Sequence, residues 1–253
     1  MDGTLIDFLQ TVALTTEIGA IRMKNITAER IALSSTQGDM FLDGRLHGNI
    51  RIEAGGEGEV KVKGKSVSGE RLFISAYHGD ITMESMVSSD ECHLQTVVGY
   101  LVAKSLKCDA SSLTIAENGR VKVERFSGGR IEAHVTKGSI EMTIESLTGN
   151  SNISLFSGEI NLIIPNNPRF KIVLSAPHVF VDPRLQNSGE LKLNPDTNGC
   201  EEFSTLGTAK NPSEPVLYVR VERGFLNVAV FEKTSNKNAV TQGSSDYTQT
   251  FSE

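Results

Sequence analysis

The sequence repeats a glycine every 19 to 21 residues through most of its length, and two apolar residues follow each glycine at fixed positions. They stand two and four positions after the glycine, and the residue between them is mostly polar. The series consists of Gly19, Gly38, Gly58, Gly79, Gly99, Gly119, Gly138, Gly158 and, after longer gaps, Gly189 and Gly224. Alternating apolar and polar residues are typical of a β-strand with one buried face. A fixed period of this length indicates a repeat protein.

A second alternating segment lies later in each repeat, as in Ile31 and Leu33. A single apolar residue between the two segments, such as Ile26 or Phe126, predicts a corner. Equivalent positions recur once per repeat, so each strand should stack in parallel on its counterpart in the next repeat, instead of forming hairpins. The sequence therefore predicts an all-β fold, a parallel β-solenoid of about ten coils with roughly twenty residues per coil.

We expect residues 1–231 to form a single β-solenoid domain, of which residues 1–18 are an N-terminal cap or a partial coil. Prolines concentrate in residues 165–188 and recur in 194–215, which predicts surface loops there because proline cannot donate to a strand ladder. Residues 232–253 are rich in Ser, Thr, Asn and Gln, which predicts a flexible polar tail.

The net charge of −6 argues against a nucleic-acid or acidic-lipid partner, which normally requires a basic surface. No run of eighteen apolar residues predicts a transmembrane helix, and the N-terminus has no recognisable signal peptide. The three cysteines (Cys92, Cys108 and Cys200) are odd in number and irregularly spaced, which favours free thiols in a reducing compartment. We therefore expect an intracellular protein, either cytoplasmic or mitochondrial.

The repeated motif Gly-x-Ile-x-Met/Val resembles an adhesin-like domain family of unknown function. Its clearest copies are Gly79-Asp80-Ile81, Gly138-Ser139-Ile140 and Ser157-Gly158-Glu159-Ile160. The resemblance covers roughly residues 12–193 and extends to 231, and it implies a right-handed parallel β-helix. It brings no catalytic residues. The family includes bacterial surface-associated proteins and uncharacterised eukaryotic members, and the chain resembles the eukaryotic members more closely. It differs from the bacterial members in lacking an export signal, which argues against an adhesive role at a cell surface.

The segment from Met1 to Asp7 resembles the phosphatase signature Asp-x-Asp-Gly-Thr-Leu-Ile-Asp of the haloacid dehalogenase superfamily. That chemistry needs a nucleophilic aspartate two positions before Asp2, and it needs an α/β pattern that is missing here. We therefore interpret Gly3, with Leu5 two positions later, as a degenerate repeat.

Three acidic residues, Asp39, Glu59 and Asp80, directly follow repeat glycines on three successive coils. Stacked carboxylates could bind Ca²⁺ or cleave a polysaccharide. We favour the alternative of three solvated carboxylates at a turn, because like charges tolerate this spacing only in water. The five histidines occupy different positions in their repeats, so they do not form a metal site. We predict no catalytic residue, no cofactor and no metal site.

Five apolar or aromatic residues are expected to point outward or to lie at turns: Phe41, Phe73, Tyr77, Tyr100 and Val102. Single apolar residues are common on protein surfaces. If these five share one flank of the solenoid, that flank is the candidate surface for a protein partner.

Val12 and Leu14 precede Gly19 as Ile31 and Leu33 precede Gly38, so the chain begins partway through a coil. An open parallel edge invites pairing with other strands. A helical cap at residues 3–12, residues upstream of this chain or another protein could cover it. We expect residues 1–14 to pack over this end and a partner to contact it.

These observations leave two function classes. The first is a non-enzymatic β-solenoid scaffold or protein-interaction module. The alternative is a polysaccharide-binding or polysaccharide-cleaving β-helix protein, which the fold class alone suggests. The chain has no Trp and four Tyr, whereas sugar sites usually stack rings on these residues. The sequence therefore favours the scaffold.

Overall fold

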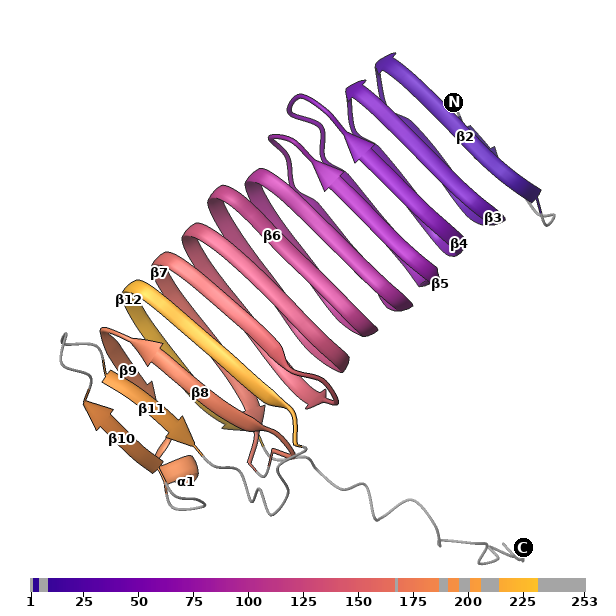
Figure 1. Ribbon diagram of the computed structural model, residues 1–253. Helices are drawn as coiled ribbons and strands as arrows, with labels where there is room; N and C mark the ends of the chain where they lie inside the picture. The colour runs from indigo at the N-terminus through magenta and orange to yellow at the C-terminus, as the bar shows by residue number, and fades with distance from the viewer. Residues whose placement is uncertain are drawn as a thin grey trace, which may run out of the picture.

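The computed structural model describes residues 2–4, 9–166, 168–186, 191–195, 201–205 and 214–231. These residues form a rod of stacked coils (Figure 1). The elements in chain order are β1 (Asp2–Thr4), β2 (Leu9–Ile18), β3 (Ile21–Gln37), β4 (Met40–Ala54), β5 (Val60–Ala76), β6 (Ile81–Leu147), β7 (Ser151–Pro165), β8 (Lys171–Ala176), β9 (His178–Val181), α1 (Pro183–Gln186), β10 (Leu191–Pro195), β11 (Glu201–Thr205) and β12 (Val216–Phe231).

The coils pair in parallel with a shift of one repeat. Ile21 aligns with Met40 between β3 and β4, Met40 aligns with Val60 between β4 and β5, and Val60 aligns with Ile81 between β5 and β6. The 67-residue β6 continues through several coils without interruption. This register is the one that the glycine period predicts, so the prediction of an all-β parallel solenoid is confirmed, with the four-residue α1 as a small exception.

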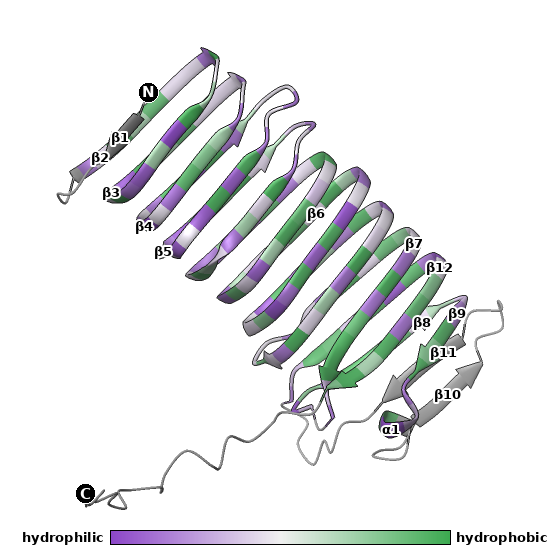
Figure 2. Ribbon diagram, turned by 180° about the vertical axis from the view of Figure 1, so that it is seen from behind, coloured by the Kyte–Doolittle hydropathy of each residue, from purple (hydrophilic) through white to green (hydrophobic). Residues whose placement is uncertain are grey.

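The core runs along the inside of the coils. In the columns two and four positions after the repeat glycines, every residue with a described side chain is at most 8% exposed. Corner residues such as Ile26 and Phe126 are fully buried, as their position in the repeat predicts. Figure 2 shows hydrophobic and hydrophilic residues alternating along the coils. Burying one aliphatic side chain stabilises the fold by about 1.5–3 kcal/mol, and each coil contributes several buried aliphatic side chains.

The repeat glycines stack on one another. A Cβ atom on Gly138 would lie 1.8 Å from the carbonyl oxygen of Gly119, so no larger residue fits at this corner without displacing the backbone of the preceding coil. Eight such contacts connect nine glycines, from Gly19 through Gly158 to Gly224. The solenoid therefore makes about eight turns, fewer than the ten that the sequence suggests.

The difference arises at the C-terminal end, where the coils do not follow chain order. Gly189 lies outside the described residues, and the glycine that stacks on Gly158 is Gly224. β12 pairs in parallel with β7 along one edge and with β8 and β9 along the other. Figure 1 shows β12 between these strands. The chain therefore steps over one coil position after β7, and β12 occupies that position later.

The prediction of surface loops at residues 165–188 and 194–215 is partly wrong. Residues 165–188 contain β8, β9 and α1, and residues 194–215 include β11, which pairs antiparallel with both β8 and β10. The prolines among the described residues of these segments stand at strand ends and between elements, where no ladder donor is needed. Pro165 ends β7, and Pro183 is the first residue of α1, a position that proline favours.

The N-terminal residues form strands. β1 and β2 both pair in parallel with β3, so they make a partial coil, and the alternative of a helical cap at residues 3–12 is wrong. Gly3 aligns with Met23 and not with Gly19, so its interpretation as a degenerate repeat glycine is also wrong. The expected tail, residues 232–253, lies outside the described residues.

Candidate functional site

The three acidic residues after the repeat glycines act as links between coils. Asp39 Oδ1 accepts a hydrogen bond from the backbone N–H of Glu59 at 2.9 Å, and Asp80 Oδ1 accepts one from the N–H of Tyr100 at 2.8 Å. Glu59 has a longer side chain, and its Oε1 lies 3.7 Å from Lys61 Nζ. Asp39 and Asp80 therefore satisfy backbone donors of the next coil, which explains an acidic residue at this corner without any chemistry.

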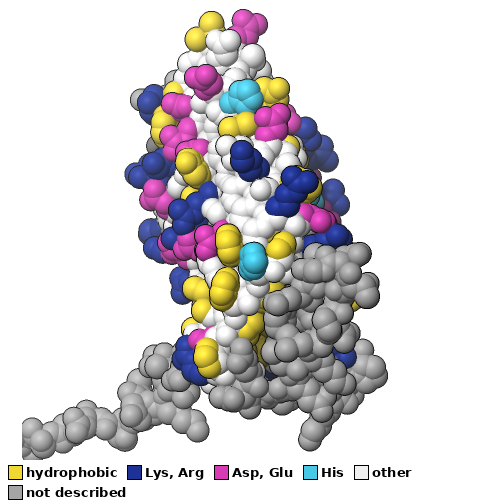
Figure 3. All heavy atoms as spheres, turned by 90° about the vertical axis from the view of Figure 1, so that its left-hand side faces the viewer, with side chains coloured by type: hydrophobic (Ala, Val, Ile, Leu, Met, Phe, Trp, Pro, Cys, Tyr) yellow, Lys and Arg dark blue, Asp and Glu magenta, His cyan; other side chains and the backbone are white. Residues whose placement is uncertain are grey.

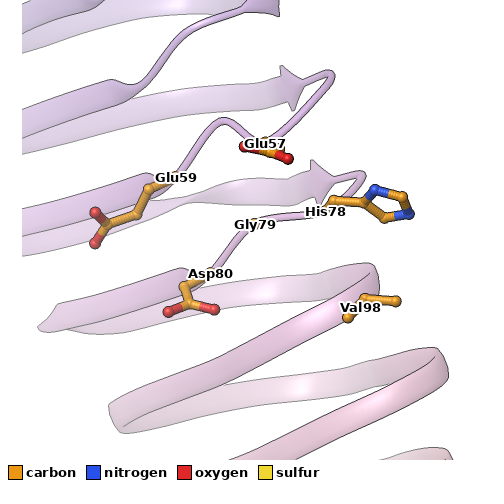
Figure 4. A pocket seen from close by; sticks show the side chains of 6 residues that line it. All are labelled: Glu57, Glu59, His78, Gly79, Asp80 and Val98. Atoms are coloured by element: carbon orange, nitrogen blue, oxygen red, sulfur yellow. The ribbon is translucent and has the colours of Figure 1, made fainter.

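The turns near these acids enclose two open hollows. One has a volume of about 480 Å³ and is lined by Glu57, Glu59, His78, Gly79, Asp80 and Val98. In Figure 4, Glu59 and Asp80 point to one side of the turn, whereas Glu57 and His78 point to the other. The second, of about 510 Å³, lies at the preceding turn and includes Asp39. Among the described residues, no three His, Cys, Asp or Glu side chains come close enough together to hold a metal ion.

The five expected surface residues lie in several places. Phe41 and Val102 both lie in the outward column between the two core columns. They are not neighbours in this column, because Lys61 aligns with Phe41 on the next coil and lies between them. Phe73 belongs to the second strand of its coil and aligns with Arg51 and His93. The structure does not bring the five onto one flank.

Arginine side chains cover two of these rings. The Arg22 guanidinium lies 5.0 Å from the ring centroid of Phe41, and that of Arg51 lies 4.9 Å from that of Phe73. Tyr77 and Tyr100, at the turns, are 55% and 54% exposed. A role of these residues in partner binding stays a prediction.

A charged column runs beside the core columns, five positions after the repeat glycines. Its first four members alternate in sign: Lys24, Asp43, Lys63 and Glu84. Lys24 Nζ lies 3.5 Å from Asp43 Oδ2, and Lys63 Nζ lies 3.3 Å from Glu84 Oε1. If a coil stacked on the coil that follows its native neighbour, like charges would lie side by side. The alternating column therefore favours the native pairing of the coils. Figure 3 likewise shows basic and acidic side chains interspersed over one face of the rod.

Two cysteines pack inside the core on neighbouring coils. Cys92 and Cys108 are free and buried, and Ser89 Oγ lies 3.6 Å from Cys108 Sγ. A hydrogen bond with Cys108 and burial raise the pKa of the Cys92 thiol well above its usual value, which keeps it protonated and unreactive. Cys200 lies outside the described residues.

An aromatic cluster lies at the C-terminal end and consists of His178 and Phe180 on β9 and Phe225 on β12. The ring of Phe225 stacks with that of His178 at a centroid distance of 5.2 Å and with that of Phe180 at 6.5 Å, both nearly parallel. Phe180 is 58% exposed and Phe225 is 49% exposed. No other described residues form a stacked group of three exposed rings.

Polar groups adjoin the aromatic cluster. Asn227 Nδ2 donates hydrogen bonds of 2.8 Å to both Glu159 Oε1 and Asn161 Oδ1. Asn227 aligns with Phe180, so these amides and the carboxylate continue the same outward face. The cluster therefore combines exposed rings with a fixed set of hydrogen-bonding groups, a combination that is typical of binding surfaces.

The sequence does not reveal this cluster, because the prolines in residues 165–188 predict a surface loop there. The alternation of His178, Val179, Phe180 and Val181 was the available signal for a strand. Its pairing with Phe225 could not be inferred, because the two segments are far apart in the chain and their coils are not in chain order.

None of the described residues forms a helix that is long and apolar enough to cross a membrane. A family model described as Toastrack DUF4097 matches residues 45–222, which is more than half of the chain. The comparisons with curated proteins and with solved structures gave no match. The match begins within β4 and ends within β12, so it includes most of the coils described above. The chain therefore belongs to the Toastrack DUF4097 family of β-solenoid domains of unknown function.

Proposed function

We propose that this domain is a non-enzymatic scaffold that binds a protein partner through the aromatic cluster. The observation that carries the proposal is that Phe180 and Phe225 are about half exposed while they stack against each other. Removing apolar surface from water is the dominant favourable contribution to most protein–protein association. Clustered exposed rings are typical of the centre of protein interfaces.

The chemistry around the cluster indicates the kind of partner. The exposed carboxylate of Glu159 lies beside the rings, and the whole chain carries a net charge of −6. A cation is attracted both to the face of an aromatic ring and to a carboxylate. The partner segment that fits best presents an apolar side chain next to Arg or Lys.

The experiment compares cross-linking of the full chain in cells with that of Phe225→Ala and a matched control, Tyr218→Ala. Tyr218 lies on the same strand as Phe225 and is 48% exposed, but it lies outside the cluster. We expect one partner to be lost with Phe225→Ala and kept with Tyr218→Ala, while all three proteins melt at the same temperature. Equal capture by the three proteins would contradict the proposal.

Polysaccharide binding remains an alternative because rings beside amide groups can also hold a sugar. The observation that favours this alternative concerns binding of a sugar, because it rests on the rings and amides of the cluster and not on the carboxylates of Asp39 and Asp80. Titration of soluble polysaccharides into the protein distinguishes the two. Binding that is lost in Phe225→Ala would favour the sugar over the protein partner.

The N-terminal end is a second expected contact. β2 pairs with β3 along one edge, and none of the described strands pairs with its other edge. Ile18, at the end of β2, is 79% exposed. Such an edge favours the addition of another strand, so we propose that a partner also contacts this coil.

We further propose that the protein acts inside the cell, in the cytoplasm or in mitochondria. The free thiols of Cys92 and Cys108 support this location, because neighbouring thiols persist best in a reducing compartment. An adhesin-like role would require an extracellular location, which these thiols do not favour. Localisation of the tagged full-length protein by microscopy tests this expectation.

A further inference from the structure

The coil made by residues 214–231, here named the insert coil, is placed out of chain order. It lies between β7 and the pair of strands β8 and β9, which precede it in the chain by more than thirty residues. We propose that the insert coil is exchangeable, and that the slot between β7 and β8/β9 also accepts the insert coil of a second copy of this chain. Reciprocal exchange then gives a dimer. This inference does not depend on the proposed function.

The slot is built by one continuous part of the chain. Every strand partner of the insert coil lies in β7, β8 or β9, from Ser151 to Val181. Further hydrogen bonds come from the same region: the N–H of Val216 donates to Asn150 Oδ1 at 2.9 Å, and the N–H of Asp182 donates to the carbonyl of Val228 at 2.9 Å. A second copy of the insert coil can therefore make the same contacts, as strand exchange between identical chains requires.

A clasp holds the far end of the insert coil. Arg184 Nη2 donates to the carbonyl of Val230 at 3.2 Å and to Asp182 Oδ2 at 2.8 Å. The clasp residues also belong to the part of the chain that builds the slot. They can close on an insert coil from either chain.

The slot is selective for the sequence that enters it. A Cβ atom at position 224 would lie 1.8 Å from the carbonyl oxygen of Gly158, and Gly224 has φ +141, so the occupant needs glycine there. It also needs three alternating aliphatic residues on each side, because Leu217, Val219, Val221, Leu226, Val228 and Val230 are all buried. This chain's own residues 214–231 meet these requirements, which is why we assign the slot to a second copy and not to an unrelated peptide.

The connection to the insert coil allows exchange. β11 ends at Thr205 and pairs with β8, so residues 206–213 connect the body to the insert coil. Eight extended residues span at most about 28 Å. A short connection gives the chain's own insert coil an effective concentration in the millimolar range, so the monomer prevails in dilute solution. Exchange requires the coil to leave the slot first, and high protein concentration then favours the dimer.

The first experiment uses the full chain with a protease recognition sequence inserted between Gly207 and Thr208, prepared in ¹⁴N and ¹⁵N forms. Equal amounts are unfolded together, refolded at high concentration, cut by the protease and weighed by native mass spectrometry. Particles whose body carries one label and whose insert coil carries the other report exchange. We expect about half of the particles from the dimer fraction to be mixed, and few from a sample refolded at micromolar concentration.

The second experiment requires no refolding. The cut ¹⁴N protein is incubated with an excess of the ¹⁵N fragment that starts at Thr208, and uptake is measured by mass. We expect uptake to fall at least tenfold for a fragment with Leu226→Asp, because this variant places a charge in the core. A tenfold loss corresponds to about 1.4 kcal/mol of binding free energy. The matched control is Ala229→Asp at an exposed position of the same strand, which should bind like the wild-type fragment. The proposal is wrong if neither experiment yields mixed particles, or if the Leu226→Asp fragment enters as readily as the wild type.

Discussion

The glycine column offers a direct test of how closely the coils approach one another. We consider Gly138→Ala, at a position with φ +133 where the new methyl group would meet the carbonyl oxygen of Gly119 at 1.8 Å. Two other glycines separate the contributions. Gly19 has φ +109 with nothing within 4 Å of a Cβ atom, and Gly149 has neither a positive φ nor a contact shorter than 3.4 Å.

The expected losses of folding free energy follow from these geometries. Placing an L-residue at positive φ costs about 1–2 kcal/mol, which is the whole effect expected for Gly19→Ala. Gly138→Ala adds the displacement of a backbone carbonyl, about 1–3 kcal/mol more. Gly149→Ala should change stability by less than about 1 kcal/mol, and it can stabilise the fold by restricting the unfolded chain.

Thermal melts followed by circular dichroism measure these differences. In a chain of this size, 1 kcal/mol shifts Tm by about 2–4 °C, so Gly138→Ala should lower Tm by roughly 4–20 °C. Gly19→Ala should fall between Gly138→Ala and wild type, and Gly149→Ala should stay near wild type. Equal Tm values for Gly138→Ala and Gly19→Ala would refute the argument that backbone contact between coils requires the glycines.

Three further outcomes are expected. Val121→Asp places a charge in the core and should lower the free energy of unfolding by about 3 kcal/mol or more, whereas Lys122→Gln on the outward side should lower it by about 0.5 kcal/mol. Similar urea midpoints for the two variants would contradict the assignment of Val121 to the inside and Lys122 to the outside of the coil. The hydrogen bonds that Asp182 accepts from Arg184 lower the pKa of Asp182 from 3.8 to about 2. The ionised form of Asp182 therefore stabilises the fold above about pH 4, and this contribution is lost as the pH falls toward 2. Wild type should therefore lose more Tm than Asp182→Asn between pH 4 and pH 2, and parallel curves would show that the clasp does not contribute. Deleting residues 2–14 removes β1 and most of β2 and exposes the edge of β3, so we expect association in light scattering; a deletion variant that stays monomeric and equally stable would show that the edge needs no cover.

The fold within each coil could be predicted because its determinants are local and repeated. The glycine spacing places Ile21 on Met40 and Met40 on Val60, and the short corners between coils leave the chain no other neighbour to stack on. The alternation around each glycine also identifies which side chains are buried, because a strand presents successive residues to opposite faces.

The candidate site was much less predictable. The roles of Asp39 and Asp80 depend on distances of 2.8–2.9 Å to backbone N–H groups of the next coil, which no residue pattern reports. The coverage of Phe41 by Arg22 likewise depends on how two neighbouring coils align. The sequence could only nominate these residues as exposed.

The sequence by itself determined the repeat, the register of consecutive coils and the buried columns. The tertiary structure alone decided where the last coil lies. Gly224 and the aliphatic residues around it carry the same pattern as every other coil, so the pattern does not distinguish which coil they join. The chain between Pro165 and Val216 is long, so it does not force β12 to follow β7 and β8/β9 in chain order. The pairing of both edges of β12, with β7 and with β8/β9, then determines its position. The same pairing brings Phe225 against His178 and Phe180, because side chains at aligned positions of neighbouring strands must lie next to each other.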